Sequence, residues 1–555
     1  MGTIHAMLQW TWQRLSWGHI PEVVLALGLI FFFCYPVDNQ NFHRTTYLNY
    51  VSAHGFAVAQ HLSPDEGFLM YNRKNVERDG TISYWPYNRF CITPFALIRF
   101  VSAPFDGKIA AQIVASRLLM RLFLVLAALY AWLALVRLFG KKEASTVAVL
   151  LALSSATLLH FSEMVFNDLP ALFGMTLLFH GMVVYEQEER FRQLALKSAI
   201  ALLMAWQCYA VLMPYTIIRI ALRFRELRSP KALLHPLAAL AVGMVLLGVL
   251  ILVVNFAQEA AAMGKPLFEL PSVQSMLYRV GLADNPRYDI DKHYVAWPFF
   301  LKQELHRMGE MGTPEWWLRL RNEGLVADGT FYRWFGPAAH SILYGWKCLL
   351  GVAGFAIGSL ALKGTKQKTA LLAFLLSGVV WSFPMRHFVA IHPFQAMFYF
   401  SVPLLAYTVI SDRIESRFPR IGRLLLPMAL VTVLCSVIQV HAATAGAADF
   451  GKWNRLTEDA QAIYDMTQDN CVVFLDIAPR EVLQSEHAPA AYLPHCMFTL
   501  YPERATFVVT EHRPAEADNL TPANRLLFLT MAKSFEKAAE ASVADGEQEP
   551  KENTE

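Results

Sequence analysis

Three acidic residues stand where a carboxylate could do chemistry, each beside a long apolar run. Asp38 directly follows the run 23–35, and Glu163 and Asp168 lie in a short turn between two apolar runs. A carboxylate at the mouth of a membrane helix, partly screened from water, can act as a general base toward a substrate at the bilayer surface. Aspartate is also common at helix ends, so capping is the alternative role for Asp38 and Asp168.

Basic residues that could bind an anion occur beside similar runs. Arg89 ends the aromatic string Ser-Tyr-Trp-Pro-Tyr-Asn-Arg, and Arg386 precedes His387 and His392. A guanidinium at headgroup height suits bidentate contact with a phosphate, although snorkelling to ordinary lipid headgroups is the alternative for Arg89. Since no nearby acid completes a metal site around the two histidines, we interpret Arg386 and the histidines as an anion site.

Two further arginines, Arg117 and Arg121, lie one turn apart inside the apolar run 110–136. An arginine that faces lipid is costly, so both are expected to face the bundle interior or a water-filled cavity. There they could pair with the acids of the turn that holds Glu163 and Asp168.

The composition predicts that membrane helices position these residues. Of the 555 residues, 55% are hydrophobic and only 17% are charged, whereas an average soluble protein has about 25% charged residues. The 48 basic and 45 acidic residues nearly balance, which argues against a nucleic-acid partner. The seven cysteines form no CxxC pair, so neither a thiolate metal site nor a disulfide scaffold is indicated.

Apolar stretches long enough to cross a bilayer recur along the chain. They are residues 21–37, 110–136, 144–162, 168–185, 197–222, 233–257, 339–362, 369–384, 395–411 and 423–441. Basic clusters between them belong in the cytoplasm by the positive-inside rule. All clusters fall on one side only if 197–222 is a hairpin of two short helices that turns near Met213 and Pro214, which raises the count to about eleven helices.

This topology places the N-terminus in the cytoplasm and the C-terminus outside. It gives a catalytic transmembrane domain (1–441) with external loops 38–109 and 258–338, a small external α/β domain (442–535) and a disordered acidic tail (536–555). Strand-like runs at Cys471–Asp476 and Ala505–Thr510 support the α/β assignment. Asp79-Gly80 predicts a hairpin turn in the first loop, and a disulfide between Cys471 and Cys496 is left open.

Taken together, these residues resemble a known class of enzymes. An apolar first helix that ends in Asp38, a long first external loop in which Asp79-Gly80 leads to Arg89, and an acid at the second external turn, Asp168, are similar to the GT-C membrane glycosyltransferases. The pattern looks closest to the branch of protein mannosyltransferases and aminoarabinose transferases. Ala115-Ser-Arg-Leu and Asn255 with Gly264-Lys-Pro-Leu also look like that group.

The resemblance implies an all-α polytopic GT-C-like fold with the external α/β domain described above. It implies an inverting glycosyltransferase of the bacterial inner membrane, which moves a sugar from a polyprenyl-phosphate donor to a hydroxyl of a glycan, lipid or protein acceptor. Carried over by position, Asp38 becomes the base and Asp168, or in second place Glu163, the other acid. The departing phosphate would be stabilised by Arg89, Arg117, Arg386 and His392.

Some features depart from that pattern or leave it open. Tyr87-Asn-Arg-Phe stands where aminoarabinose transferases often carry a basic-proline string, and Trp316-Trp317 is followed by Leu318 rather than by the aspartate of oligosaccharyltransferases. The need for a divalent metal is open. One competing hypothesis is a transporter or flippase of lipid-linked glycans, but the sequence lacks the internal repeat that many transporters have. The other is an O-antigen ligase or polymerase.

Overall fold

The computed structural model describes most of the helical part of the chain. The described residues are 19–37, 47–64, 67–76, 82–106, 108–224, 237–238, 248–284, 295–314, 338–363, 365–446, 471–476 and 505–510. Asp38, Asp79-Gly80, Trp316-Trp317, Cys496 and the acidic tail lie outside them. The chain divides into two compact units, one formed by 1–39, 88–105 and 111–448, here called the helical unit, and one formed by 40–87, 106–110 and 449–555.

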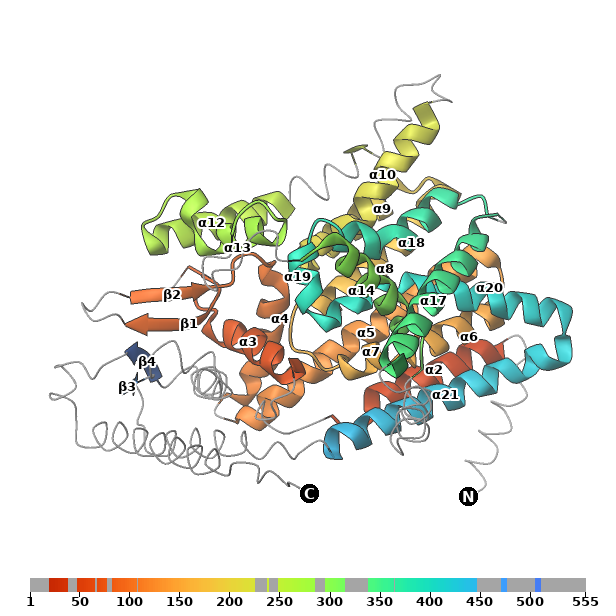
Figure 1. The fold of residues 1–555 in the computed structure, drawn as a ribbon, viewed down its shortest axis with the longest axis horizontal. Coiled ribbons are helices and arrows are strands. Elements are labelled where there is room, and N and C mark those ends of the chain that lie inside the picture. The colour runs from red at the N-terminus through yellow and green to blue at the C-terminus, as the bar shows by residue number, and fades with distance from the viewer. Residues whose placement is uncertain are drawn as a thin grey trace, which may run out of the picture. The chain divides into compact units, whose positions relative to one another are not determined.

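Helices make up almost all of the described part of the helical unit (Figure 1). They are α2 (Ile20–Cys34), α4 (Ile92–Ser102), η2 (Ala103–Phe105), α5 (Ile109–Phe139), α6 (Lys142–Leu153), α7 (Ala156–His160), α8 (Asp168–Glu188), α9 (Phe191–Met204), η3 (Trp206–Cys208), α10 (Tyr209–Phe224), α12 (Leu250–Met263), η5 (Leu267–Glu269), α13 (Pro271–Arg279), α14 (Trp297–Met311), α17 (Ala338–Leu360), η7 (Ala361–Lys363), α18 (Lys368–Ser382), α19 (Arg386–Ile391), η8 (Pro393–Tyr399), α20 (Ser401–Arg417) and α21 (Pro419–Gly446).

Apolar helices mark the chain as an integral membrane protein. Within the described residues, five are long and apolar enough to cross a bilayer, namely Ala110–Phe139, Asp168–Glu188, Gly345–Lys363, Phe394–Arg417 and Pro419–His441. Four shorter apolar helices accompany them, at Ile20–Cys34, Ile92–Phe105, Ile251–Met263 and Lys368–Ser382. Where they are described, the apolar runs of the sequence lie on helices, although 144–162 is divided between α6 and α7. Most of 233–257 lies outside the described residues, and the count of about eleven crossings stays a prediction.

The helices differ in how much of their surface is buried. Most of α8 and α20 is buried inside the unit, and Phe179 of α8 stacks on Phe374 of α18 with ring centroids 4.0 Å apart. By contrast, α17 and α21 expose large apolar side chains such as Leu349, Leu424 and Met428. Since exposed apolar surface of this extent is expected against lipid, α17 and α21 are among the helices that face the bilayer.

Glycines allow α14 to pack directly against α17. A Cβ atom added at Gly309 would lie 1.9 Å from the carbonyl oxygen of Lys347, and one at Gly351 would lie 2.2 Å from that of Leu305. Both positions therefore exclude any side chain. This close contact of small residues is the way in which membrane helices commonly associate.

The segment predicted to form a hairpin does reverse direction. Cys208 donates to the carbonyl oxygen of Ala171 near the start of α8, whereas Arg219 of α10 pairs with Glu186 near its end. The turn itself was predicted wrongly at Met213-Pro214. The chain breaks instead at Ala205, whose backbone is extended, and Pro214 lies inside α10, where it removes one hydrogen bond without reversing the chain.

The second unit contains the described strands. Helix α3 (Tyr47–His61) precedes an antiparallel pair formed by β1 (Tyr71–Val76) and β2 (Ile82–Pro86), while the turn predicted at Asp79-Gly80 lies outside the described residues. The Tyr87 hydroxyl bonds His54 Nδ1 at 2.7 Å and ties α3 to the end of this pair. In the C-terminal part, β3 (Cys471–Asp476) and β4 (Ala505–Thr510) pair in parallel, which confirms the two predicted strands. The α/β domain as a whole stays a prediction, because its other elements lie outside the described residues.

Exposed ion pairs link the basic turns at one end of the helices. Lys141 reaches Asp412 at 3.6 Å, Arg137 reaches Glu188 at 2.5 Å, and Lys142 pairs with Glu22. Their side chains are roughly 30–45% exposed. We call the region formed by these three ion pairs the basic end. These pairs bring the turn at 137–142 next to Glu22, Glu188 and Asp412.

Candidate active site

Asp168, predicted as a site acid, is the first residue of α8 and is only 1% exposed. Its Oδ1 accepts a hydrogen bond from Gln395 Nε2 at 2.8 Å, and Gln395 Oε1 in turn accepts one from Trp381 Nε1 at 2.6 Å. Asp168 Oδ2 and both amide atoms of Asn167 are buried and have no hydrogen-bond partner among the described residues. No side chain caps α8. The carboxyl group is thus held on one side, and its other oxygen is a buried acceptor that a ligand or a water molecule could satisfy.

Two arginines share one aromatic ring, and one of them, Arg279, acts electrostatically on Asp168. The guanidinium carbons of Arg89 and Arg279 lie 5.1 and 5.9 Å from the ring centre of Phe90. Phe90 also packs edge-to-face on Phe166 at 5.0 Å, two residues before Asp168. Since two like charges share one ring beside a buried acid, this place has the chemistry to bind a second, anionic group.

The position of Arg89 is fixed by α12. Asn255 Nδ2 donates to the carbonyl oxygens of Phe90 at 3.0 Å and of Asn88 at 3.3 Å. One turn further along α12, the buried Glu259 accepts from Asn88 Nδ2 at 3.0 Å. Residues four apart lie on one face of a helix, so α12 holds the backbone on both sides of Arg89.

His392 lies beside the same arginines and is uncharged. Its Nδ1 donates to the carbonyl oxygen of Phe388 at 2.6 Å. Burial lowers the pKa of His392 to about 3, and the positive charges of Arg279, Arg307 and Arg89 act in the same direction. A neutral imidazole whose Nδ1 donates its proton presents an acceptor at Nε2. In this state His392 adds no positive charge for a phosphate.

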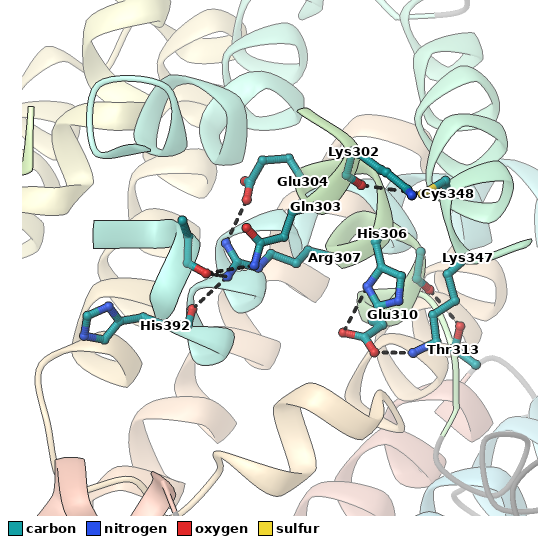
Figure 2. Close-up of polar contacts among 12 residues, drawn as sticks. Lys302, Gln303, Glu304, His306, Arg307, Glu310, Thr313, Lys347, Cys348 and His392 are labelled. Carbon is teal, nitrogen blue, oxygen red and sulfur yellow. Dashed lines mark hydrogen bonds and ion pairs between the residues drawn. The ribbon is translucent and has the colours of Figure 1, made fainter. Parts of the chain in front are cut away.

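Arg307 on α14 holds the segment that carries His392 (Figure 2). Its Nη2 donates to the carbonyl oxygens of Ala390 at 3.2 Å and of His392 at 3.4 Å, and the imidazole ring points away from it. Its Nη1 donates to Glu304 Oε1 at 2.7 Å, and Tyr399 donates to Glu304 Oε2 at 2.6 Å. Both members of this ion pair are at least 95% buried.

The other predicted anion-binding arginines lie in different surroundings. Arg386 bonds His387 at 3.0 Å and lies 4.3 Å above the ring of Trp297, so it belongs to an aromatic cluster at the start of α19. Arg117 is 2% exposed within α5. Arg121, one turn further, pairs with Glu163, which confirms the expectation that an arginine of this run meets an acid of the turn.

The described carboxylates do not assemble a metal site. Among the residues that the structure covers, no three of His, Cys, Asp and Glu come together as ligands. Glu163 is engaged by Arg121 and Glu304 by Arg307, whereas Asp168 has one buried carboxylate oxygen without a hydrogen-bond partner among the described residues.

Sequence reasoning missed Arg279, Arg307 and Gln395 as site residues. Arg279 and Arg307 lie on α13 and α14, within the segment 258–338 that we predicted as an external loop. A weak signal for Arg307 was present in the sequence, because an acid, Glu304, lies three residues before it on the same helix face. Gln395 is neutral and was visible only as the end of a polar string.

Comparisons with known proteins give a distant likeness of fold. No protein-family profile and no curated protein matches the chain. A solved structure of the archaeal oligosaccharyltransferase AglB from Archaeoglobus fulgidus, in complex with an inhibitory peptide and a dolichol-phosphate, aligns over 89% of this chain and 65% of its own, with a TM-score of 0.48 and 11% identity. An Archaeoglobus fulgidus oligosaccharyltransferase tethered to an acceptor peptide with the NVT sequon aligns over 88% and 59%, with a TM-score of 0.44 and 12% identity.

The chain thus spans less than two thirds of the length of these structural neighbours.

Proposed function

We propose that this protein is an inverting glycosyltransferase of the GT-C type, which takes a sugar from a polyprenyl-phosphate donor. The observation that carries the proposal is the buried Asp168, held by Gln395 with one oxygen open, beside two arginines on the ring of Phe90. Such a transfer needs a carboxylate that acts on the acceptor hydroxyl and cations that stabilise the leaving phosphate.

In the proposed reaction, Asp38 acts as the general base. It removes the proton of an acceptor hydroxyl, whose oxygen attacks the anomeric carbon of the sugar from the side opposite the phosphate. The bond from that carbon to the phosphate oxygen breaks, and polyprenyl phosphate leaves with the electron pair. Asp168 and Asn167 bind and orient hydroxyl groups through their buried polar atoms that have no hydrogen-bond partner among the described residues.

The leaving phosphate is bound by Arg89 and Arg279 in this proposal. Both are fixed before the reaction, Arg89 by the bonds from Asn255 to its neighbours and Arg279 by its place over the ring of Phe388 at 4.3 Å. Preorganised positive charge stabilises a phosphate that develops negative charge. Arg117, Arg386 and His392 remain secondary candidates, and His392 would serve as a neutral acceptor.

Mass spectrometry of the source cells tests the proposal. We expect that cells without the gene accumulate a polyprenyl-phosphate sugar and lack that sugar on a surface glycan, lipid or protein. Restoring the gene reverses both changes, and the Asp38→Asn variant at equal abundance does not. Unchanged lipid-linked sugars and surface sugars after deletion would contradict the proposal. Donor that accumulates only on the cytoplasmic face would support a flippase instead.

We also propose that the basic end lies in the cytoplasm, with the N-terminus inside and the C-terminus outside, as expected for a bacterial inner membrane protein. Reporter fusions after Lys231 and Lys366 should then report cytoplasm. An external signal at both positions would contradict this topology.

A further inference from the structure

Arg121 caps the carboxyl end of the first described helix, α2. Its Nη1 donates to the carbonyl oxygens of Phe32 at 3.4 Å and of Tyr35, and its Nη2 donates to that of Pro36 at 3.1 Å. These groups are among the carbonyls that a helix end leaves without partners. A positive charge at the carboxyl end of a helix is also favoured by the helix dipole.

Glu163 provides the counter-charge for this arginine. Arg121 Nη2 bonds Glu163 Oε1, and the two side chains are 6% and 14% exposed. A guanidinium inside a membrane bundle is costly without such a partner, and its planar fork can serve several acceptors at once. The pair thus joins α5, the turn before α8 and the end of α2.

The point that Arg121 holds is where the chain enters the first external loop. Tyr35 is extended, as a residue before proline should be, and Pro36 prevents the helix from continuing. Asp38 follows two residues after Pro36, within about 7 Å along the backbone. An arginine that fixes the carbonyls of Tyr35 and Pro36 therefore fixes the start of the segment that carries the proposed base.

We propose that Arg121 and Glu163 form a positioning pair for the transfer reaction, and that Glu163 is not a catalytic acid. This inference rests on the function proposed above. It assigns the second acidic role to Asp168 alone, since Asp168 keeps an open oxygen while Glu163 is bound to Arg121. Its expected signature is a fall in turnover with little change in the apparent affinity for the donor.

Substitution of Glu163 separates the two roles. In Glu163→Gln the amide oxygen still accepts from Arg121, so we expect kcat within about 3-fold of the wild type and an unchanged pH–rate profile. Removal of a general acid or base lowers the rate by about 10²- to 10⁴-fold. A loss of that size, together with the loss of one limb of the pH–rate profile, would overturn the inference. Glu188→Gln at the basic end is the matched control.

Substitution of Arg121 tests the capping role. A lysine cannot reach three carbonyl oxygens and a carboxylate together, so Arg121→Lys should lower kcat by about 10- to 100-fold with apparent KM for the donor unchanged. Arg137→Lys, on the same helix but in an exposed ion pair, is the matched control and should keep full activity. Full activity of Arg121→Lys would contradict a positioning role.

A double variant covers the case in which single changes prevent folding. Arg121→Met with Glu163→Met removes both charges, and should accumulate in the membrane but remain slow. Recovery of wild-type kcat would show that the two charges only neutralise each other and position nothing, which would overturn the inference.

The assay measures release of polyprenyl phosphate by the purified full-length protein, with lipids extracted from the source cells as donor. If the wild-type protein itself releases none, the proposed function fails. If the wild type is active and the variants behave otherwise than expected, only the positioning role fails.

Discussion

Charge is exposed at one end of α8 and buried at the other. At the basic end, Lys141, Asp412 and Glu188 lie in ion pairs that are well exposed to solvent. Around the start of α8, Asp168 is 1% exposed, and the pair of Arg307 with Glu304 is at least 95% buried. Arg219 with Glu186 is a buried pair near the basic end, and there it packs on Tyr185.

The difference indicates what each end does. Exposed ion pairs add little stability, so the basic end serves mainly to fix which side of the membrane the turns occupy. Buried charges cost free energy unless they are fully bonded, and buried titratable groups with few partners often mark functional sites. The end of α8 that carries Asp168 is therefore the place to look for chemistry.

The largest effect on stability is expected at Arg307. Arg307→Met leaves Glu304 buried without its counter-charge and frees the carbonyl oxygens of Ala390 and His392. We expect a loss of about 3–5 kcal/mol in the free energy of unfolding, measured by thermal unfolding in detergent. Replacing Glu304 by Gln as well should recover part of it. A single variant as stable as the wild type would show that the buried pair is not needed.

The next effect concerns Arg279, which sequence reasoning missed. Arg279→Gln keeps an unbranched polar side chain, although a shorter one, and removes the charge beside Asp168 and the ring of Phe388. We expect release of polyprenyl phosphate to slow by about 10- to 100-fold, or about 1.4–2.8 kcal/mol. An unchanged rate in a kinetic assay would remove Arg279 from the phosphate site and weaken the contrast between the two ends.

A smaller, pH-dependent effect is expected from His392. Its pKa is lowered to about 3 in the folded protein, against about 6.5 in an unfolded chain. Stability is therefore complete above pH 6.5 and falls as the pH drops toward 3, by at most about 1.4 kcal/mol per pH unit. Melting temperatures between pH 7 and pH 5 should show a smaller decline for His392→Gln than for the wild type. Parallel declines would contradict the neutral assignment.

The smallest effect is expected at the basic end. Lys141→Gln and Glu188→Gln each break an exposed ion pair, so neither should change the melting temperature or the rate of transfer measurably. A clear loss of activity in either variant would mean that the two ends are not separated in function.

The sequence predicted the helices better than it predicted the site. Apolar runs become helices because burial in lipid and in the bundle demands it, so the long segments were found within a few residues. The turn near residue 205 was missed because Pro214 gave a stronger local signal than Ala205, whose extended backbone depends on packing against α8.

The site depended on contacts that sequence spacing does not reveal. Gln395 is 227 residues from Asp168, and Arg279 meets Phe90 across a similar distance along the chain. The pairing of Arg121 with an acid could be expected, since an intramembrane arginine needs a partner. That the partner is Glu163, which leaves Asp168 open, required the fold.

The most direct test compares Asp168→Asn with Asp412→Asn, an aspartate at each end of the bundle. Purified full-length variants would be assayed for release of polyprenyl phosphate from the source-cell lipid extract, with equal folding checked by thermal unfolding. We predict a loss of about 100-fold or more for Asp168→Asn and wild-type turnover for Asp412→Asn. Equal turnover in the two variants would contradict the assignment of chemistry to the buried end.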